Sequence, residues 1–236
     1  MQEQKNKMIT KSRLGILLSK LEGFYSQKVS IKPIKNINER PNVHLEQYQT
    51  DPEIASEWLW NMYMLGDVAE KKVIDQGAGT GILGIGAYIL GAKEVIFIES
   101  EFSVLEKAKE NYEKIIRDMK NEESETKRST AQFQVIKTED HMNKGDTVIQ
   151  NPPFGTRQKG IDIIFLKKAF ESAPIVYSMH KSTTREHIQK VSSQEGFKIT
   201  HTWTYHMPLK ATYSHHTRKI HRIDVDVYRF EKRKGI

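Results

Sequence analysis

The sequence contains no cysteine, which excludes disulfide bonds, zinc sites with thiolate ligands and cysteine nucleophiles. No apolar run approaches the roughly 20 residues of a membrane-spanning helix, and the N-terminus lacks the apolar region of a signal peptide. Internal repeats are also lacking. These absences predict an intracellular protein, in the cytoplasm, the nucleus or both, with no metal site of its own.

The chain has 236 residues and a formal net charge of +7. This length suits one domain with an ample core, and the basic balance favours an anionic partner. The last thirty residues concentrate positive charge and lie close to several aromatic residues: Lys210, Arg218, Lys219, His221, Arg222, Arg229, Lys232, Arg233 and Lys234, with Trp203, Tyr205, Tyr213 and Tyr228. Cations interleaved with aromatic faces are typical of a single-stranded nucleic-acid groove, although a solvated strand edge with a charged tail has the same composition.

Strands and helices are predicted to alternate along most of the chain. Strands are expected at 73–75, 94–99, 132–137, 146–150, 174–179, 197–205 and 221–230, and helices at 12–22, 81–90, 103–119, 161–171 and 183–193, with a further helix starting at Asp51-Pro52. Short connections between alternating elements predict an α/β fold, with a mostly parallel seven-stranded sheet and helices on both faces. The strict alternation of residues 223–230 predicts an antiparallel last strand.

A glycine cluster follows the first strand of this sheet. It reads Asp75-Gln76-Gly77-Ala78-Gly79-Thr80-Gly81 and leads into a helix, as in nucleotide-binding loops. Its spacing differs from the dinucleotide and phosphate-loop patterns, and Asp75 suits a ligand amino group better than a pyrophosphate. S-adenosylmethionine fits that description. Glu99 ends the next strand about twenty residues later, where ribose hydroxyls are bound in Rossmann-type folds.

The tetrapeptide Asn151-Pro152-Pro153-Phe154 follows the strand expected at 146–150. It suits methylation of an amino nitrogen conjugated to a π system, whose N–H bonds need acceptors. The side-chain oxygen of Asn151 and the carbonyl of Pro152 are acceptors, the prolines stiffen the turn, and Phe154 can stack on a planar target. The glycine loop and the tetrapeptide should meet at the carboxyl edge of the sheet.

Four segments together resemble the methyltransferase-like enzymes that make N6-methyladenosine in small-subunit ribosomal RNA. They are residues 45–50, the glycine loop, residues 151–156 and residues 177–187. The resemblance covers roughly residues 45–230. It implies a class I methyltransferase domain at 45–236, with S-adenosylmethionine as donor. The stretch at 1–44 is longer than the family leads us to expect, and its composition predicts a basic, partly helical extension that faces the RNA.

The resemblance also implies roles for individual residues. Cofactor contacts fall on Gln47, Tyr48, Thr50, Asp75, Gly77, Gly79, Glu99 and Asp140, catalysis on Asn151, Pro152, Pro153 and Phe154, and RNA binding on a loop with His180 and Lys181, the alternative for these two being a capped strand-to-helix turn. The basic composition near the C-terminus separately predicts RNA binding by Lys210, Arg218 and Lys219. Glu99 stands where the family usually has Asp, and Gln76 replaces a usual apolar residue. The mechanism implied is base flipping of one adenosine against Phe154.

Eukaryotic members of the family work with a small zinc-binding activator subunit. The strand expected at 132–137 would be an edge of the sheet, and an apolar edge needs cover. We therefore predict that the activator adds a strand there, the alternative being cover by the polar linker at 121–129.

Three other functions stay open from the sequence. Protein glutamine methylation, as on a release factor, also uses Asn-Pro-Pro but typically with Tyr in the fourth position. DNA adenine methylation usually needs a separate recognition domain. A non-catalytic RNA-binding module would not need an intact glycine loop and tetrapeptide.

Overall fold

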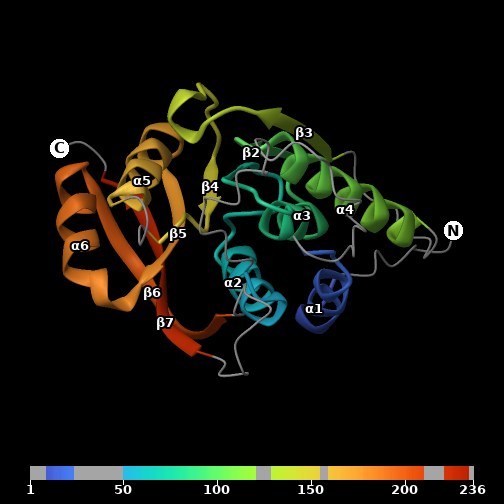
Figure 1. The fold of residues 1–236 in the computed structure, drawn as a ribbon, viewed down its shortest axis with the longest axis horizontal. Coiled ribbons are helices and arrows are strands. Elements are labelled where there is room, and N and C mark those ends of the chain that lie inside the picture. The colour runs from blue at the N-terminus through green and yellow to red at the C-terminus, as the bar shows by residue number, and fades with distance from the viewer. Residues whose placement is uncertain (1–8, 24–49, 121–128, 155–158, 210–220, 234–236) are drawn as a thin grey trace, which may run out of the picture.

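The computed structural model describes residues 9–23, 50–120, 129–154, 159–209 and 221–233 (Figure 1). One sheet of seven strands has the order β3-β2-β1-β4-β5-β7-β6. The strands are β1 (Lys72–Gln76), β2 (Glu94–Glu99), β3 (Thr130–Val135), β4 (Thr147–Gln150), β5 (Ile175–Lys181), β6 (Phe197–Leu209) and β7 (His221–Lys232). β7 runs antiparallel to β5 and β6, whereas the pairs among β1 to β5 are parallel. The predicted sheet is confirmed.

Helices cover both faces of this sheet. They are α1 (Lys11–Ser19), α2 (Pro52–Met64), α3 (Ile82–Ile89), α4 (Phe102–Lys120), α5 (Ile161–Ser172) and α6 (Arg185–Gln194). Alternation along β2 separates the two faces, because Phe97 joins the core cluster that includes α1 to α4, whereas Ile96 and Ile98 join the cluster that includes α5 and α6. We refer to these as the α1–α4 face and the α5–α6 face.

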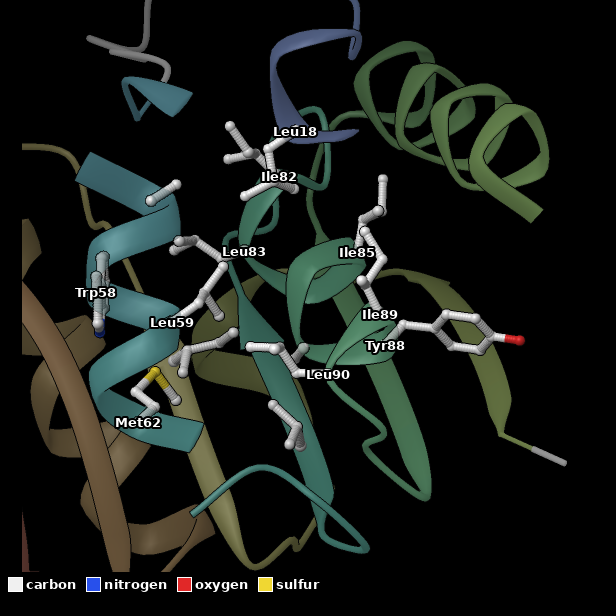
Figure 2. Close-up of a cluster of buried hydrophobic side chains, with 14 of the residues drawn as sticks. Leu18, Trp58, Leu59, Met62, Ile82, Leu83, Ile85, Tyr88, Ile89 and Leu90 are labelled. Atoms are coloured by element: carbon white, nitrogen blue, oxygen red, sulfur yellow. The ribbon is translucent and has the colours of Figure 1, made fainter. Parts of the chain in front are cut away.

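The first helix is part of the core of the α1–α4 face. Leu14, Leu17 and Leu18 are buried against α2 and α3, and Figure 2 shows Leu18 beside Ile82 in this cluster. Burying each leucine stabilises the fold by about 1.5–3 kcal/mol. The described part of the predicted extension at 1–44 therefore shares one core with the rest of the chain.

The start of α2 follows the capping chemistry that its sequence predicts. The Asp51 carboxylate accepts a hydrogen bond of 2.9 Å from the backbone N–H of Glu53, and Pro52 occupies the first helical turn. This cap fixes where the helix begins, and it therefore also fixes the preceding residue, Thr50, which is buried at the edge of the sheet.

Several boundaries differ from the sequence-based expectation. The helix expected at 12–22 ends at Ser19, and the strand expected at 197–205 continues to Leu209. β3 spans Thr130–Val135 rather than 132–137, because its pairing with β2 begins at Thr130 and ends where Val135 faces Glu99. The strand expected at 174–179 continues to Lys181, since β7 supplies partners as far as Val225. Residues 24–49, which include much of the predicted extension, and residues 121–128 of the polar linker lie outside the described residues.

The hairpin of β6 and β7 extends past the carboxyl end of β5. The last β5–β7 pair is Lys181 with Val225, yet β6 and β7 continue to pair from His206–Asp224 to Leu209–His221. The hairpin thus projects beyond the sheet edge at which the glycine loop and the tetrapeptide lie. Within the described residues, no helix combines the length and the apolar character needed to cross a membrane.

Candidate active site

The glycine loop directly follows β1 and lies against α5. Gly77 has a φ of 71°, which favours glycine, and a Cβ placed there would lie 2.7 Å from Cε1 of Phe165. A side chain at position 77 would therefore be strained and would also push α5 away. The close approach of Phe165 therefore requires glycine at position 77 even when no ligand is bound.

Asp75 lies beneath the loop with 1% of its surface exposed. Its Oδ2 accepts a hydrogen bond of 2.7 Å from the backbone N–H of Gly84 in the first turn of α3. Burial raises the pKa of Asp75 to about 8, the Gly84 N–H opposes that rise, and the charge of Glu99 adds to it. The side chain thus ties β1 to α3, and a nearby cation would favour its ionised form.

Glu99 ends β2 beside the glycine loop. Its Oε2 accepts from the N–H of Gly79 at 3.0 Å, while Oε1 accepts from the N–H groups of Ser100 at 2.8 Å and Glu101 at 3.2 Å. Only 5% of the residue is exposed. These bonds hold a carboxylate at the loop, where the sequence predicts a ribose ligand.

Asn111 of α4 supports the loop from behind. Its Nδ2 donates to the carbonyls of Thr80 at 3.0 Å and Glu22 at 2.9 Å, and its Oδ1 accepts from the N–H of Glu22 at 2.9 Å. The segment after α1 is therefore fastened to the glycine loop through one buried amide. Sequence reasoning did not single out Asn111, because its helical position gives no signal for a partner some ninety residues away.

The tetrapeptide begins where β4 ends, next to β1. Nδ2 of Asn151 donates a hydrogen bond of 3.1 Å to Oγ1 of Thr50. This bond uses the amide nitrogen and fixes the orientation of the amide group, so that the acceptor oxygen points elsewhere. Pro152 is buried, whereas Asn151, Pro153 and Phe154 are partly exposed.

Phe154 is partly buried and packs against the core of the α1–α4 face. Nζ of Lys181, at the end of β5, lies 5.7 Å from the ring centroid, within the range of a cation–π interaction. An aromatic face, a cation and an oriented amide are thus brought together at one edge of the sheet.

Known proteins match this chain over most of its length. A family model described as conserved hypothetical protein 95 matches residues 50–203. The rRNA N(6)-adenosine-methyltransferase METTL5 of Danio rerio is 36% identical over 196 residues, which cover 81% of this chain and 91% of the relative. The Drosophila melanogaster enzyme of the same name is 33% identical, with 82% and 89% covered. The chain belongs to the METTL5-like family of rRNA N6-adenosine methyltransferases.

Solved structures agree with this membership. A Pyrococcus horikoshii protein, PH1948, described provisionally as an RNA methyltransferase, shares 38% identity and a TM-score of 0.74, with 94% of this chain and 98% of that chain covered. The magnesium protoporphyrin IX methyltransferase of Synechocystis, solved with bound S-adenosylmethionine, has a TM-score of 0.56 at 13% identity, with 76% and 78% covered, and it shows the shared fold alone. The predicted class I methyltransferase fold and, for the METTL5-like family, the predicted donor S-adenosylmethionine are confirmed.

The site of this METTL5-like chain fits that donor. The glycine loop exposes backbone at Gly77 and Gly79, Asp75 and Glu99 supply carboxylates, and Oγ1 of Thr80 is buried with no partner among the described residues. A ligand with an ammonium, a sulfonium and ribose hydroxyls matches two carboxylates better than it matches a phosphate-binding loop. The described residues contain no cluster of metal-ligating side chains.

Other predicted site residues are placed differently or lie outside the described residues. Asp140 is exposed in a short 3-10 helix, η1 (Thr138–Asp140), and its cofactor role stays a prediction. Gln47, Tyr48, Lys210, Arg218 and Lys219 lie outside the described residues.

His180 is a correction to the sequence-based placement. It was expected with Lys181 in an RNA-contacting loop, but it lies inside β5 with only 1% of its surface exposed, because β5 runs on to Lys181. Its side chain is buried next to Asp162 of α5, while Lys181 remains partly exposed. Sequence reasoning also missed Gln150, Ser178 and Asp162, which surround His180 and the strand before the tetrapeptide.

Proposed function

We propose that this chain transfers a methyl group from S-adenosylmethionine to N6 of a single adenosine in small-subunit ribosomal RNA, with the base flipped out of its stack against Phe154. The observation that carries this proposal is the hydrogen bond from Asn151 Nδ2 to Thr50 Oγ1. It engages the amide nitrogen of Asn151, and in this proposal the amide oxygen is the atom that accepts from the amine. Membership of the METTL5-like family supports the same reaction.

The chemistry requires hydrogen-bond acceptors near the amine. The lone pair of an adenine N6 is delocalised into the ring, and acceptors for its two N–H bonds let that lone pair turn toward an electrophile. Bound S-adenosylmethionine would supply a methyl group on a positively charged sulfur, which keeps the electron pair of the broken C–S bond, while N6 forms the new C–N bond and releases one of its protons to solvent. Asn151 Oδ1 accepts one N–H and the Pro152 carbonyl accepts the other, so catalysis is mainly positioning and electrostatics.

The aromatic ring and the cation next to it hold the base. Phe154 stacks on the adenine, and Lys181 contributes charge close to that ring. Flipping one nucleotide out of its stack costs a few kcal/mol, which stacking against Phe154 partly offsets. Gln47, Tyr48 and Thr50 cover the methionine end of the cofactor in this proposal, Glu99 binds the ribose, and Asp140 contacts its adenine.

The RNA backbone approaches along the β6–β7 hairpin. The hairpin projects past the end of β5 on the side of the tetrapeptide, and the chain between its strands carries Lys210, Arg218 and Lys219. Phosphate contacts by such residues would make binding strongly dependent on salt. An RNA substrate also fits the predicted cytoplasmic or nuclear location.

A small zinc-binding activator pairs with β3 in this proposal. β3 is an edge of the sheet, and Val135 at its end is 50% exposed. Unpaired N–H and carbonyl groups along such an edge accept an added strand. Hydrogen exchange should slow along Thr130–Val135 when the activator is added, and a fully active isolated chain with unchanged exchange at β3 would contradict this part.

The reaction is tested by incubating the protein, with and without the activator, with S-adenosylmethionine and unmodified small-subunit ribosomal RNA. Nucleosides are then measured by mass spectrometry. N6-methyladenosine should appear, and Asn151→Ala should lower kcat by about 10²-fold or more, with cofactor Kd nearly unchanged. Asn61→Ala, which changes an asparagine of α2, is the control.

Other outcomes would point to other functions. Cofactor binding without RNA product would favour a glutamine side chain in a protein, or adenine in DNA, as the acceptor. Failure to bind S-adenosylmethionine would favour a non-catalytic RNA-binding module. A collapse of cofactor affinity in Asn151→Ala would show that the role given to Asn151 is wrong.

A further inference from the structure

A row of buried polar side chains crosses the α5–α6 face just below the carboxyl edge of the sheet. It consists of Gln76 in β1, Gln150 in β4, and Ser178 and His180 in β5, and we call it the polar row. Gln150 pairs with Ser178 in the sheet register. All four residues are at most 1% exposed. Three of them lie two residues beyond buried aliphatic side chains on the same face, namely Ile74, Val148 and Val176.

The polar row is continuous. Nε2 of Gln76 donates to Oε1 of Gln150 at 2.7 Å, and Nε2 of Gln150 donates to Oγ of Ser178 at 2.9 Å. Oγ of Ser178 lies 2.7 Å from Nε2 of His180. Because Nδ1 of His180 faces the carboxylate of Asp162, we place the ring proton on Nδ1, so that Nε2 accepts the hydroxyl proton of Ser178.

The partners at the two ends of the row fix the direction of its hydrogen bonds. At one end, the Nδ1 of His180 that carries the proton lies 3.6 Å from Oδ2 of Asp162. At the other end, Oε1 of Gln76 can only accept, so His141 donates to it from Nε2 at 3.1 Å. Burial lowers the pKa of both histidines, that of His141 to about 4. Both are therefore neutral, as the hydrogen bonds of the polar row require. Every donor thus points from His141 toward Asp162.

Residues of the polar row are sequence neighbours of the glycine loop and of the tetrapeptide. Gln76 directly precedes Gly77, and Gln150 directly precedes Asn151. Asp162 lies in the first turn of α5, the helix that follows the tetrapeptide. Nε2 of Gln76 also donates to the carbonyl of Phe165 at 2.8 Å, on the residue whose ring packs against Gly77.

We propose that the polar row is a positioning device that holds Asn151 in fixed register with the glycine loop and with α5. Ser178 and His180 are positioning residues and act through Gln150, without touching the substrate. A row with one member removed leaves buried donors and acceptors unpaired, and such a network no longer specifies one arrangement. This inference rests on the proposed function, because it concerns the geometry of the same methyl transfer.

The test compares two buried serines on the same face. Ser178→Ala breaks the row between Gln150 and His180. Ser192→Ala removes a hydroxyl that is equally buried but only donates to the carbonyl of Gln189 within its own helix, at 3.0 Å. For Ser178→Ala we expect kcat for rRNA methylation to fall about tenfold or more, with less than about twofold change in cofactor Kd or in KM for RNA. Ser178→Thr, which restores a hydroxyl, should recover activity, and Ser192→Ala should keep it.

A second measurement does not depend on turnover. Hydrogen–deuterium exchange at the backbone N–H groups of Asn151 and Phe154 should speed up in Ser178→Ala and stay unchanged in Ser192→Ala. Should Ser178→Ala fail to fold, Asp162→Asn carries the same two measurements, since it keeps the size of the side chain and removes the carboxylate at the end of the row.

Three results would overturn the inference. They are unchanged exchange at Asn151 and Phe154, equal loss of kcat in the Ser178 and Ser192 variants, and a loss of cofactor affinity that accounts for the lost activity. An unaltered protein that makes no N6-methyladenosine would contradict the proposed function instead, and the exchange measurement would still decide the role of the row.

Discussion

The two faces of the sheet satisfy their polar groups at the carboxyl edge in different ways. On the α1–α4 face, the carboxylates of Asp75 and Glu99 accept from backbone N–H groups of nearby turns. On the α5–α6 face, Gln150 and Ser178 bond to side chains of other strands. These carboxylates bond to backbone groups at most 20 residues away along the chain, whereas Gln76 and Gln150 are 74 residues apart. A row of side chains exists only once the whole sheet has assembled.

The largest expected loss of stability comes from a change in the apolar core of the α1–α4 face. Leu18→Ala removes a fully buried side chain that packs between α1 and α3, and we expect the free energy of unfolding to fall by about 2–5 kcal/mol in urea denaturation. Ile16→Ala in the same helix changes a side chain that is 51% exposed, and its effect should stay within about 0.5 kcal/mol. Equal effects would mean that α1 does not belong to the core.

The next effect tests the other face with a change of polarity. Gln76→Leu keeps roughly the same volume but removes hydrogen bonds to Gln150, His141 and the carbonyl of Phe165. Each buried group left unpaired costs about 1–3 kcal/mol, so for three such groups we expect the free energy of unfolding to fall by about 3 kcal/mol or more in urea denaturation. Gln132→Leu, at an exposed position of β3, is the control. A Gln76→Leu protein as stable as the control would show that the row contributes nothing to folding.

The same contrast explains which parts of the fold and of the site can be predicted from the sequence. The sheet, its order of helices and strands, and the loop at Gly77 depend on local periodicity and on turn residues, and these were predicted. Glu99 could be found because its distance from the loop along the chain is set by one helix and one strand. The local sequence therefore carries the α1–α4 half of the site.

The polar row could not be predicted in this way. Gln76 stood out only as a polar residue in a place that is usually apolar, and nothing along the chain links it to Gln150 or Ser178. His180 was assigned to a loop, because the added length of β5 depends on pairing with β7, some forty residues later. Register between distant strands brings these residues together, and the order of residues along one strand does not reveal it.

A pH-dependent effect concerns the proton on Asp75. Its pKa is about 8 in the folded protein and 3.8 in the unfolded chain. Between these values the folded state holds a proton that the unfolded state has released, so stability falls as pH rises through that window, by at most about 1.4 kcal/mol per pH unit. Asp75→Asn removes the titration, and its amide oxygen can still accept from Gly84.

The measurement for Asp75 is urea denaturation without cofactor at several pH values between those two limits. The stability of Asp75→Asn should fall less steeply with rising pH than that of the unaltered protein. His141 and His180 are present in both proteins, so their contributions cancel in the difference. Parallel curves would mean that the buried carboxyl does not hold its proton.

The smallest effect isolates the bond between Thr50 and Asn151, where the α1–α4 side meets the tetrapeptide. Thr50→Val keeps the shape of a buried side chain but cannot accept from Asn151 Nδ2. One neutral hydrogen bond contributes about 0.5–1.5 kcal/mol, so we expect kcat for rRNA methylation to fall by up to about tenfold. The amide of Asn151 then loses one contact that orients it, and an amide turned around would offer the amine a donor where an acceptor is needed.

Thr50→Ser is the matched control, because it keeps the acceptor oxygen and loses only a methyl group. It should retain most of kcat, and both variants should keep the stability of the unaltered protein to within about 1 kcal/mol. If Val and Ser lowered kcat equally, the methyl group and its packing would matter and the hydrogen bond would not. If instead the Val variant lost cofactor affinity with kcat unchanged, Thr50 would act by binding S-adenosylmethionine, as the family resemblance implies. Another contact would then have to orient Asn151.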